Sequence, residues 1–144
     1  MTDTDNMIAG LRAWLKKYDE LADTRIDVDH LRGGIGSFSI LADSMPETLA
    51  TFMFGRQRRR TFYLSRECAY GDDSEQNIDN LAWYEDFSRW VYRQDMLREY
   101  PDLGDGMTCF SVADSTAGSI VAITESGKAE YRIGISIDYT ERMI

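Results

Sequence analysis

The stretch that decides the fold is AEYRIGISIDYT, residues 129–140, in which apolar and polar side chains alternate along the whole segment. The apolar positions are Ala129, Tyr131, Ile133, Ile135, Ile137 and Tyr139. Successive side chains of a strand point to opposite faces of a sheet, so a period of two indicates a strand with one buried and one solvated face. The sequence therefore predicts a sheet that other elements cover on one side.

Shorter strands are predicted before and after a central helix. Those before it are residues 26–30, 36–41 and 59–68, with an extended, edge-like segment at 51–54 that Gly55 ends. Glycines at 33–36 predict a turn, and residues 43–48 predict a break. Those after it are residues 108–113 and 117–124, followed by a hairpin turn at 125–127 that leads into the closing strand.

Two helices are predicted from apolar residues at helical spacing. Residues 5–18 carry one apolar stripe, and Asp3, Thr4 and Asp5 supply capping groups and negative charge at its start. The second helix begins between Ser74 and Asn80 and extends to about Glu99. Its wide face of large side chains indicates the main core element, with room for part of it to meet a partner. These side chains are Trp83, Tyr84, Phe87, Trp90, Val91 and Leu97.

The order of the predicted elements favours an α+β fold. One helix, four strands, a second helix and three strands follow one another, with hairpins and without regular alternation of strand and helix. Such an order is typical of a mainly antiparallel β-sheet with two principal helices packed on one face. The length of 144 residues fits a single α+β domain, residues 1–144, with its own core.

Composition limits the classes of function. The net charge of −9 argues against tight binding of nucleic acid, although an acidic chain could surround DNA without holding it. The start of the chain does not resemble a signal peptide, and no apolar stretch is long enough to cross a bilayer. We therefore expect a protein made in the cytosol, with Cys68 and Cys109 as reduced core residues.

No constellation of residues predicts catalysis, a metal site or a cofactor site. His30 is the only histidine, and no second ligand stands at metal-binding spacing from it. Asp72, Asp73 and Glu75 lack the spacing of a calcium loop and favour a solvated loop. The glycines at 33–36 precede a strand-like segment rather than the helix that a phosphate-binding loop needs. We therefore expect no enzyme.

The segment RQRRR, residues 56–60, is the one basic run in this acidic chain. Its arginines, Arg56, Arg58, Arg59 and Arg60, are expected on a turn or edge between Gly55 and the following strand. One interpretation is a solubilising hairpin tip. The other is contact with an acidic surface, on a neighbouring subunit or another ring. A direct contact with DNA is the weaker alternative, because no aromatic residues are interleaved with the arginines.

Five stretches, in order and with similar spacing, resemble one family. They are IDVDHL at 26–31, FYLSRE at 62–67 with YGDD at 70–73, NIDNLAWYEDFSRW at 77–90, YPDLG at 100–104, and the closing strand to Tyr139. The family is the minor capsid or tail-terminator proteins of long-tailed phages and prophages of Gram-positive bacteria. The likeness covers nearly the whole chain and contains no catalytic motif. Residues 45–47 and the basic run depart from the family pattern, which leaves the partner's identity open.

The resemblance implies a phage virion protein of the tail or neck, assembled in the host cytoplasm, with no cofactor, metal or membrane. Six copies would form a homo-hexameric ring at the head-proximal end of the tail tube. The ring would stop polymerisation of the tail tube protein and join the tail to a head-side connector or stopper protein. Genomic DNA would pass through the lumen without specific binding.

A closed ring needs two different patches on each subunit. The candidates are strand edges, which readily pair between chains, at residues 51–54 and 112–123. The first edge includes Thr51, Phe52 and Phe54, and the arginines of residues 56–60 are candidates for contact with an acidic neighbour.

Two other functions stay open. The first is another neck or head-completion ring protein, similar to a stopper. The second is a small enzyme or ligand-binding α+β domain, which predicts convergent polar groups with perturbed pKa values in a pocket. The sequence shows no such group of residues. A regulator that binds nucleic acid is disfavoured by the charge of −9.

Overall fold

The computed structural model describes residues 3–28, 36–42, 45–69, 74–125 and 127–143. The helices are α1 (Asp3–Leu15), the short 3₁₀ helix η1 (Asp19–Leu21) and α2 (Ser74–Leu97). The strands are β1 (Ile26–Val28), β2 (Phe38–Ala42), β3 (Glu47–Phe52), β4 (Gly55–Ala69), β5 (Met107–Glu125) and β6 (Lys128–Arg142). These elements confirm the predicted α+β class.

The sheet is built around two long strands. β4 and β6 pair antiparallel from Gly55↔Arg142 to Ala69↔Lys128. Across the sheet the strand order is β1-β2-β4-β6-β5, and β3 also pairs with β4. β2 and β3 share one edge of β4, since β2 lies beside residues 62–66 and β3 beside residues 55–59. Every described pairing is antiparallel except that of β1 with β2.

The structure corrects several predicted boundaries. β4 begins at Gly55, not at residue 59, and β3 begins at Glu47, inside the segment predicted as a break. β5 is one strand where two were predicted. Its register to β6 shifts at several points, among them Cys109/Ser111 and Asp114/Thr116. Such bulges insert extra residues and interrupt the period of two, so a continuous strand looks like two.

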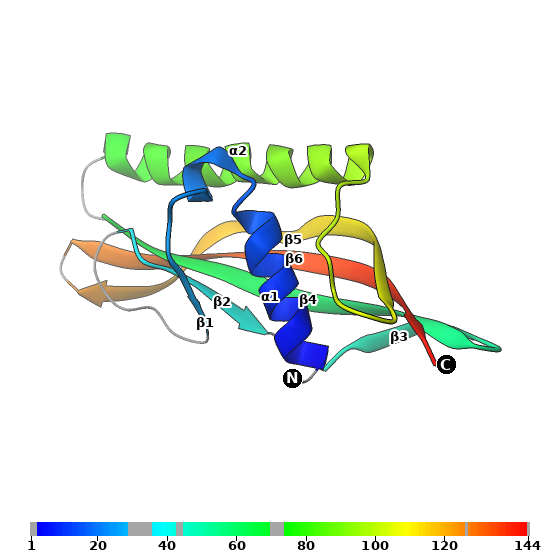
Figure 1. Cartoon of the computed structure of the whole chain (residues 1–144). Coiled ribbons are helices and arrows are strands. Elements are labelled where there is room, and N and C mark those ends of the chain that lie inside the picture. Colours follow the sequence, from blue (N-terminus) through cyan, green and yellow to red (C-terminus); the bar gives the residue numbers. More distant parts are fainter. Residues whose placement is uncertain (1–2, 29–35, 43–44, 70–73, 126, 144) are drawn as a thin grey trace.

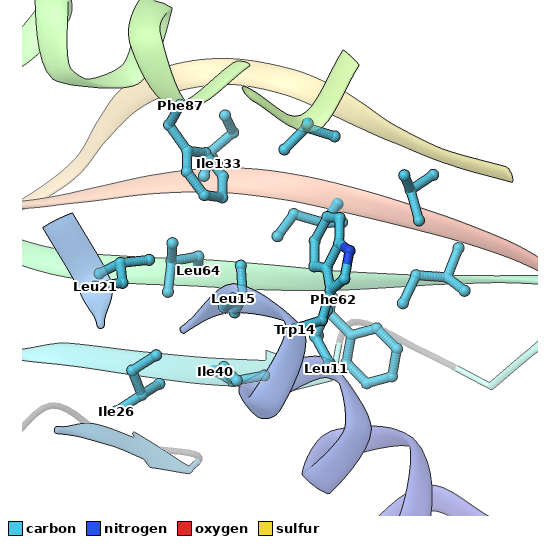
Figure 2. Packing of buried hydrophobic residues seen from close by; sticks show 14 of the residues in the cluster. Leu11, Trp14, Leu15, Leu21, Ile26, Ile40, Phe62, Leu64, Phe87 and Ile133 are labelled. Carbon is cyan, nitrogen blue, oxygen red and sulfur yellow. The ribbon is translucent and has the colours of Figure 1, made fainter. Parts of the chain in front are cut away.

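Both helices pack on the same face of the sheet, as predicted. Figure 2 shows α1 placing Leu11, Trp14 and Leu15 against the sheet, while Phe87 of α2 lies beside Ile133 of β6. The alternate residues of β4 and β6 on this face are buried, including Phe62, Leu64, Ile133, Ile135 and Ile137. The period of two in the closing strand therefore marks the core face.

Aromatic side chains join the two helices. The rings of Trp14 on α1 and Trp90 on α2 lie 4.7 Å apart between centroids. Trp14 Nε1 donates a hydrogen bond of 2.8 Å to the carbonyl of Glu99, just beyond α2. Gly10 allows α1 to approach the segment after α2, because a Cβ at this position would clash with the carbonyl oxygen of Asp102.

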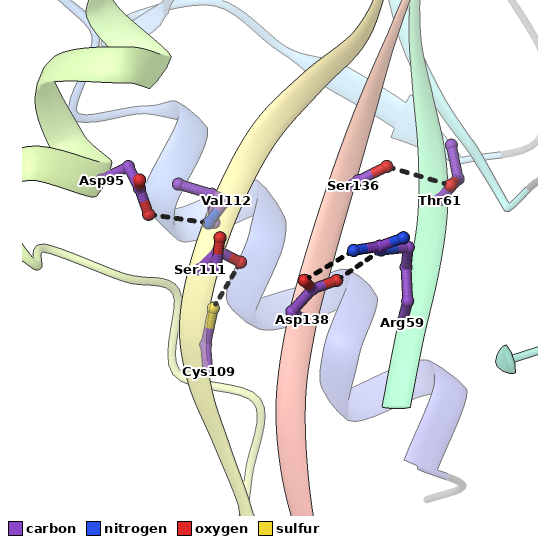
Figure 3. Close-up of polar contacts among 8 residues, drawn as sticks. All are labelled: Arg59, Thr61, Asp95, Cys109, Ser111, Val112, Ser136 and Asp138. Atoms are coloured by element: carbon purple, nitrogen blue, oxygen red, sulfur yellow. Dashed lines mark hydrogen bonds and ion pairs between the residues drawn. The ribbon is translucent and has the colours of Figure 1, made fainter. Parts of the chain in front are cut away.

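The opposite face of β4 and β6 is polar. Arg59 forms two hydrogen bonds with Asp138, of 2.7 and 3.0 Å, and the hydroxyls of Thr61 and Ser136 lie 3.2 Å apart (Figure 3). These contacts join residues that face each other across the strand pair. Among the helices that the structure describes, none is both long and apolar enough to cross a membrane.

Replacing Trp14 should be severely destabilising. Trp14→Ala removes a side chain that is 1% exposed and should lower the free energy of unfolding by about 3–5 kcal/mol. Trp14→Phe keeps a ring but leaves the Glu99 carbonyl without its donor, and should lower it by about 1–3 kcal/mol. Urea unfolding followed by circular dichroism measures both. Leu81→Ala, on the exposed side of α2, is the control, with an expected change of at most about 0.5 kcal/mol.

Candidate interaction surface

The β3–β4 hairpin projects beyond both helices at one end of the molecule, close to the C-terminus (Figure 1). All six residues of β3 are exposed. At the tip, Phe52 is 46%, Met53 87% and Phe54 56% exposed. Leu49 and Met143 are exposed too, and the Met143 amide donates to the Phe54 carbonyl at 2.8 Å. We call Leu49, Phe52, Met53, Phe54 and Met143 the hairpin patch.

The hairpin patch contains most of the predicted edge. Thr51 and Phe52 lie on β3, and Phe54 lies in the turn. Within the described residues β3 pairs with β4 alone, so its other edge has no strand partner there. An exposed edge beside large apolar side chains is a typical site of association between chains. Whether these residues form an interface stays a prediction.

The basic run does not lie on a turn or an edge, contrary to expectation. Residues 56–60 lie inside β4, with β3 on one side and β6 on the other. The hairpin tip is apolar, so the interpretation of these arginines as a solubilising tip is wrong. The reason is that β4 begins directly at Gly55, which puts the whole run into the strand.

Most of the arginines already contact acidic residues of their own chain. Arg56 pairs with Glu141 at 2.9 Å, and Arg58 reaches the other oxygen of Glu141 at 3.5 Å. Arg59 pairs with Asp138 on the polar face (Figure 3). The acidic residues that these arginines contact therefore lie on β6 of the same chain. Contact of these arginines with an acidic neighbouring subunit stays a prediction. It depends most on Arg60, because the other three arginines already pair with carboxylates of β6.

A cleft of about 180 Å³ opens between the start of α1 and the two long strands. Arg58 and Arg60 line it together with Asp3, Thr4 and Glu141. Both arginines project from the core face of β4, because Arg59 between them points to the polar face. The cleft thus brings two residues of the predicted set together and separates them from Arg59.

A second exposed apolar surface lies at the end of α2. It consists of Tyr92, Met96, Leu97 and Phe110, which we call the helix patch. A shallow cleft of about 570 Å³ beside it is lined by Met96, Phe110 and their neighbours. The assignment of Leu97 to the core face was wrong, because Leu97 is 59% exposed, and sequence reasoning did not single out the other three. Tyr92 and Met96 lie off the aromatic stripe of α2, which was their signal, whereas Phe110 lies on β5.

The predicted edge at residues 112–123 is partly closed. Asp95 of α2 accepts a hydrogen bond of 3.1 Å from the Val112 amide (Figure 3). The same carboxylate accepts a hydrogen bond of 3.0 Å from the Tyr100 hydroxyl. The backbone amide at Val112 is therefore bonded to the helix. β5 pairs only with β6 among the described strands.

Polar groups also converge beside the start of α2. The Arg66 guanidinium lies 4.6 Å from the Trp83 ring centroid and donates to Cys68 Sγ at 2.6 Å and to Asn80 Oδ1 at 3.1 Å. Arg66, Cys68 and Asn80 line a cleft of about 180 Å³. Burial raises the pKa of the Cys68 thiol although Arg66 opposes the shift. The thiol is thus a poor nucleophile, and these groups satisfy one another rather than leave a reactive atom.

Both cysteines are free and buried, which confirms their prediction as core residues. Burial raises the pKa of Cys109 to about 12, and its thiol donates to the Ser111 carbonyl at 3.5 Å (Figure 3). Neither thiol has the depressed pKa of a catalytic cysteine.

Several residues that the sequence analysis considered as site candidates fall outside the part of the chain that the structure describes. His30, residues 33–35, Asp72 and Asp73 lie outside the described residues, as does the side chain of Glu75. Within the described part of the chain, no three histidine, cysteine or acidic side chains are grouped in a way that could hold a metal ion.

The thiols should react slowly in the folded protein. A raised pKa means less thiolate at pH 8, and burial blocks the reagent. We expect Cys68 and Cys109 to react with an aromatic disulfide reagent at least about a hundredfold more slowly than in urea, where unfolded thiols have a pKa of about 8.5. Absorbance of the released thiol measures this. Rapid modification without loss of structure would contradict the burial of either thiol.

The two acidic partners of the basic run should differ in importance. Glu141→Gln takes a charged partner from Arg56 and Arg58, and should lower the free energy of unfolding by about 1–3 kcal/mol. Asp138→Asn should lower it by less than about 1 kcal/mol, because Arg59 is 45% exposed and can turn to water. Urea unfolding at constant ionic strength compares them, and the reverse order would contradict the assignment.

Neither a comparison with protein-family models nor one with curated protein sequences finds a match to this chain. The likeness to phage tail terminators therefore stays a prediction from the sequence. Within the described residues, the hairpin patch, the helix patch and the arginine cleft are the surfaces from which a function can be inferred.

Proposed function

We propose that the protein is a structural subunit of a phage virion, a tail terminator that forms a homo-hexameric ring. The ring closes the head-proximal end of the tail tube, stops its polymerisation and joins it to the head-side connector. The observation that carries the proposal is the projecting hairpin with its exposed apolar patch. The resemblance of five sequence stretches to this family adds to it.

The hairpin patch supports an association between chains. Phe52, Met53 and Phe54 lie at the end of an arm that neither helix covers (Figure 1). Large exposed apolar groups in contiguous positions are unusual on a monomer and mark surfaces that a partner buries. Aromatic residues and methionine are enriched in such interfaces. The edge of β3 that has no strand partner among the described residues can add backbone hydrogen bonds to a neighbour.

Two separate apolar surfaces fit a ring better than a two-fold dimer. A ring has a heterologous interface, in which one patch of a subunit meets a different patch of the next. The hairpin patch and the helix patch come from different elements, the first from β3 and the following turn and the second from α2 and β5. A two-fold dimer needs only one self-complementary patch.

The pairing of the arginines supports a lumen that does not hold DNA. Arg56, Arg58 and Arg59 lie beside two carboxylates of β6, Glu141 and Asp138, which balance two of their three charges within the chain. The net charge of the whole chain is −9. DNA can slide past such a wall because strong binding to phosphate depends on unpaired basic side chains.

The test is the mass and shape of the purified protein, alone and with its tail tube protein. Light scattering and electron micrographs should show a ring of about six copies, or a cap on one tube end that halts growth. The triple variant Phe52→Ser, Met53→Ser, Phe54→Ser should remain folded and lose the ring or cap. Leu81→Ser, an exposed leucine at the start of α2, is the control and should keep both.

The same samples separate the alternatives. A ring that binds the portal or adaptor and leaves tube growth unchanged would identify a stopper-like neck protein instead. A monomer at all concentrations that binds neither tube nor connector would contradict the proposal and favour a ligand-binding domain. The variant must keep the circular dichroism of the wild type, so that a lost ring reflects the surface and not unfolding.

A further inference from the structure

The cleft between α1 and the two long strands contains a buried arginine that has no acidic partner among the residues that the structure describes. Arg60 is 8% exposed. Its Nη1 donates a hydrogen bond of 2.9 Å to Thr4 Oγ1, and its guanidinium lies 5.4 Å from the centroid of the Phe62 ring. Among the described residues, no carboxylate forms an ion pair with it. A buried cation is costly unless an anion and further hydrogen bonds compensate it.

The second arginine of the cleft is only partly compensated. Arg58 reaches Glu141 at 3.5 Å and donates to the Pro46 carbonyl at 3.0 Å. Glu141 is shared, since its other oxygen pairs with Arg56 at 2.9 Å. The Nε atoms of Arg58 and Arg60 are both buried and have no hydrogen-bond partner in the described part of the chain. The donors of the cleft thus outnumber the acceptors that the described residues supply to them.

The remaining charged group at the cleft is Asp3. Asp3 lines the cleft and is exposed at the start of α1, and it forms no ion pair with Arg60. Two arginines and two carboxylates, Asp3 and Glu141, therefore face the cleft, but Glu141 is also held by Arg56. Within the described residues, one positive charge, that of Arg60, is left without an anion in contact.

We propose that this cleft binds a single carboxylate group between Arg58 and Arg60. The flat guanidinium fork matches a carboxylate and can bind it with two parallel hydrogen bonds. The carboxylate belongs to a small organic acid or to an acidic side chain of another polypeptide, a second copy included. The binding site goes beyond the proposed ring and does not depend on it.

The surroundings favour a carboxylate over a phosphate. The cleft has about 180 Å³, which suits one small acidic group and not a nucleotide. Asp3 and Glu141 add negative charge at its wall, which repels a doubly charged phosphate more strongly than a singly charged carboxylate. Thr4 offers a hydroxyl beside Arg60 that can donate to a carboxylate oxygen.

The probe is acetate, with inorganic phosphate and the neutral acetamide as comparisons, on the full chain at pH 7 and constant ionic strength. Binding is followed by the line width of ¹³C-labelled acetate and by the shift of the melting temperature relative to chloride. We expect saturable acetate binding, weaker binding of phosphate and none of acetamide. Absence of saturable acetate binding to the folded wild type, or tighter binding of phosphate, would overturn the proposal.

Variants connect binding to the cleft. Arg60→Met should weaken acetate binding at least tenfold and still fold, since a methionine can replace a buried charge. Arg59→Met is the matched control, because it removes the neighbouring arginine of the same strand on the opposite face and should leave binding unchanged. Asp3→Asn removes a competing carboxylate and should tighten binding. Equal losses in the variants at 59 and 60 would show that acetate binds only to exposed charge, and would overturn the proposal.

The same acetate titration identifies the source of the carboxylate. If an acidic side chain of a second copy occupies the cleft, acetate should lower the mass measured by light scattering, and Arg60→Met should lower it without acetate. If the natural ligand is a small acid, acetate should bind and leave the mass unchanged. Loss of the ring in the hairpin variant with intact acetate binding would separate the two proposals.

Discussion

The antiparallel pairing of β4 with β6 is the contact on which the rest of the structure depends. It runs from Gly55↔Arg142 to Ala69↔Lys128, longer than the contact of β2 or β3 with the same sheet. Because the register holds along the whole pair, the core-facing side chains of both strands align in one surface, and α1 and α2 cover its middle part. If the register of β4 with β6 slipped by one residue, this apolar surface would face water. The arginines would then no longer lie opposite the acidic residues.

The same register explains the polar chemistry of the molecule. It sets Arg59 opposite Asp138 and Arg56 opposite Glu141, so charges that are far apart in the sequence compensate each other. The alternation of the strand then forces Arg58 and Arg60 onto the core face. There the apolar core gives way to Thr4 and a small cleft, because isoleucines and leucines no longer fill the face near the hairpin. The arginine cleft is thus a consequence of placing a basic run inside a long strand.

Local patterns in the sequence predict much of this fold. The period of two over residues 129–140 identified the core face of β6, and the aromatic stripe of α2 identified the helix that covers it. The sequence could not reveal that β5 is continuous, because bulges break its period. Nor could it pair Arg59 with Asp138, since that contact depends on a register between strands that α2 and β5 separate. The interface residues were chosen by position, and Met53, the most exposed residue of the tip, fell within the predicted edge 51–54 without being singled out.

The middle of the β4–β6 pair and its end at Gly55 and Arg142 are stabilised in different ways. In the middle, apolar side chains of β4 and β6 are buried under both helices. Toward Gly55 and Arg142 the helices no longer cover β4 and β6, and the side chains there are joined by ion pairs with Glu141 and Asp138 instead. Ion pairs at a surface contribute less than core packing, so this end keeps its shape mainly through its backbone pairing with β3 and β6. An arm of this kind gains most from a partner that buries Phe52, Met53 and Phe54, because that contact supplies the apolar packing that its own chain does not.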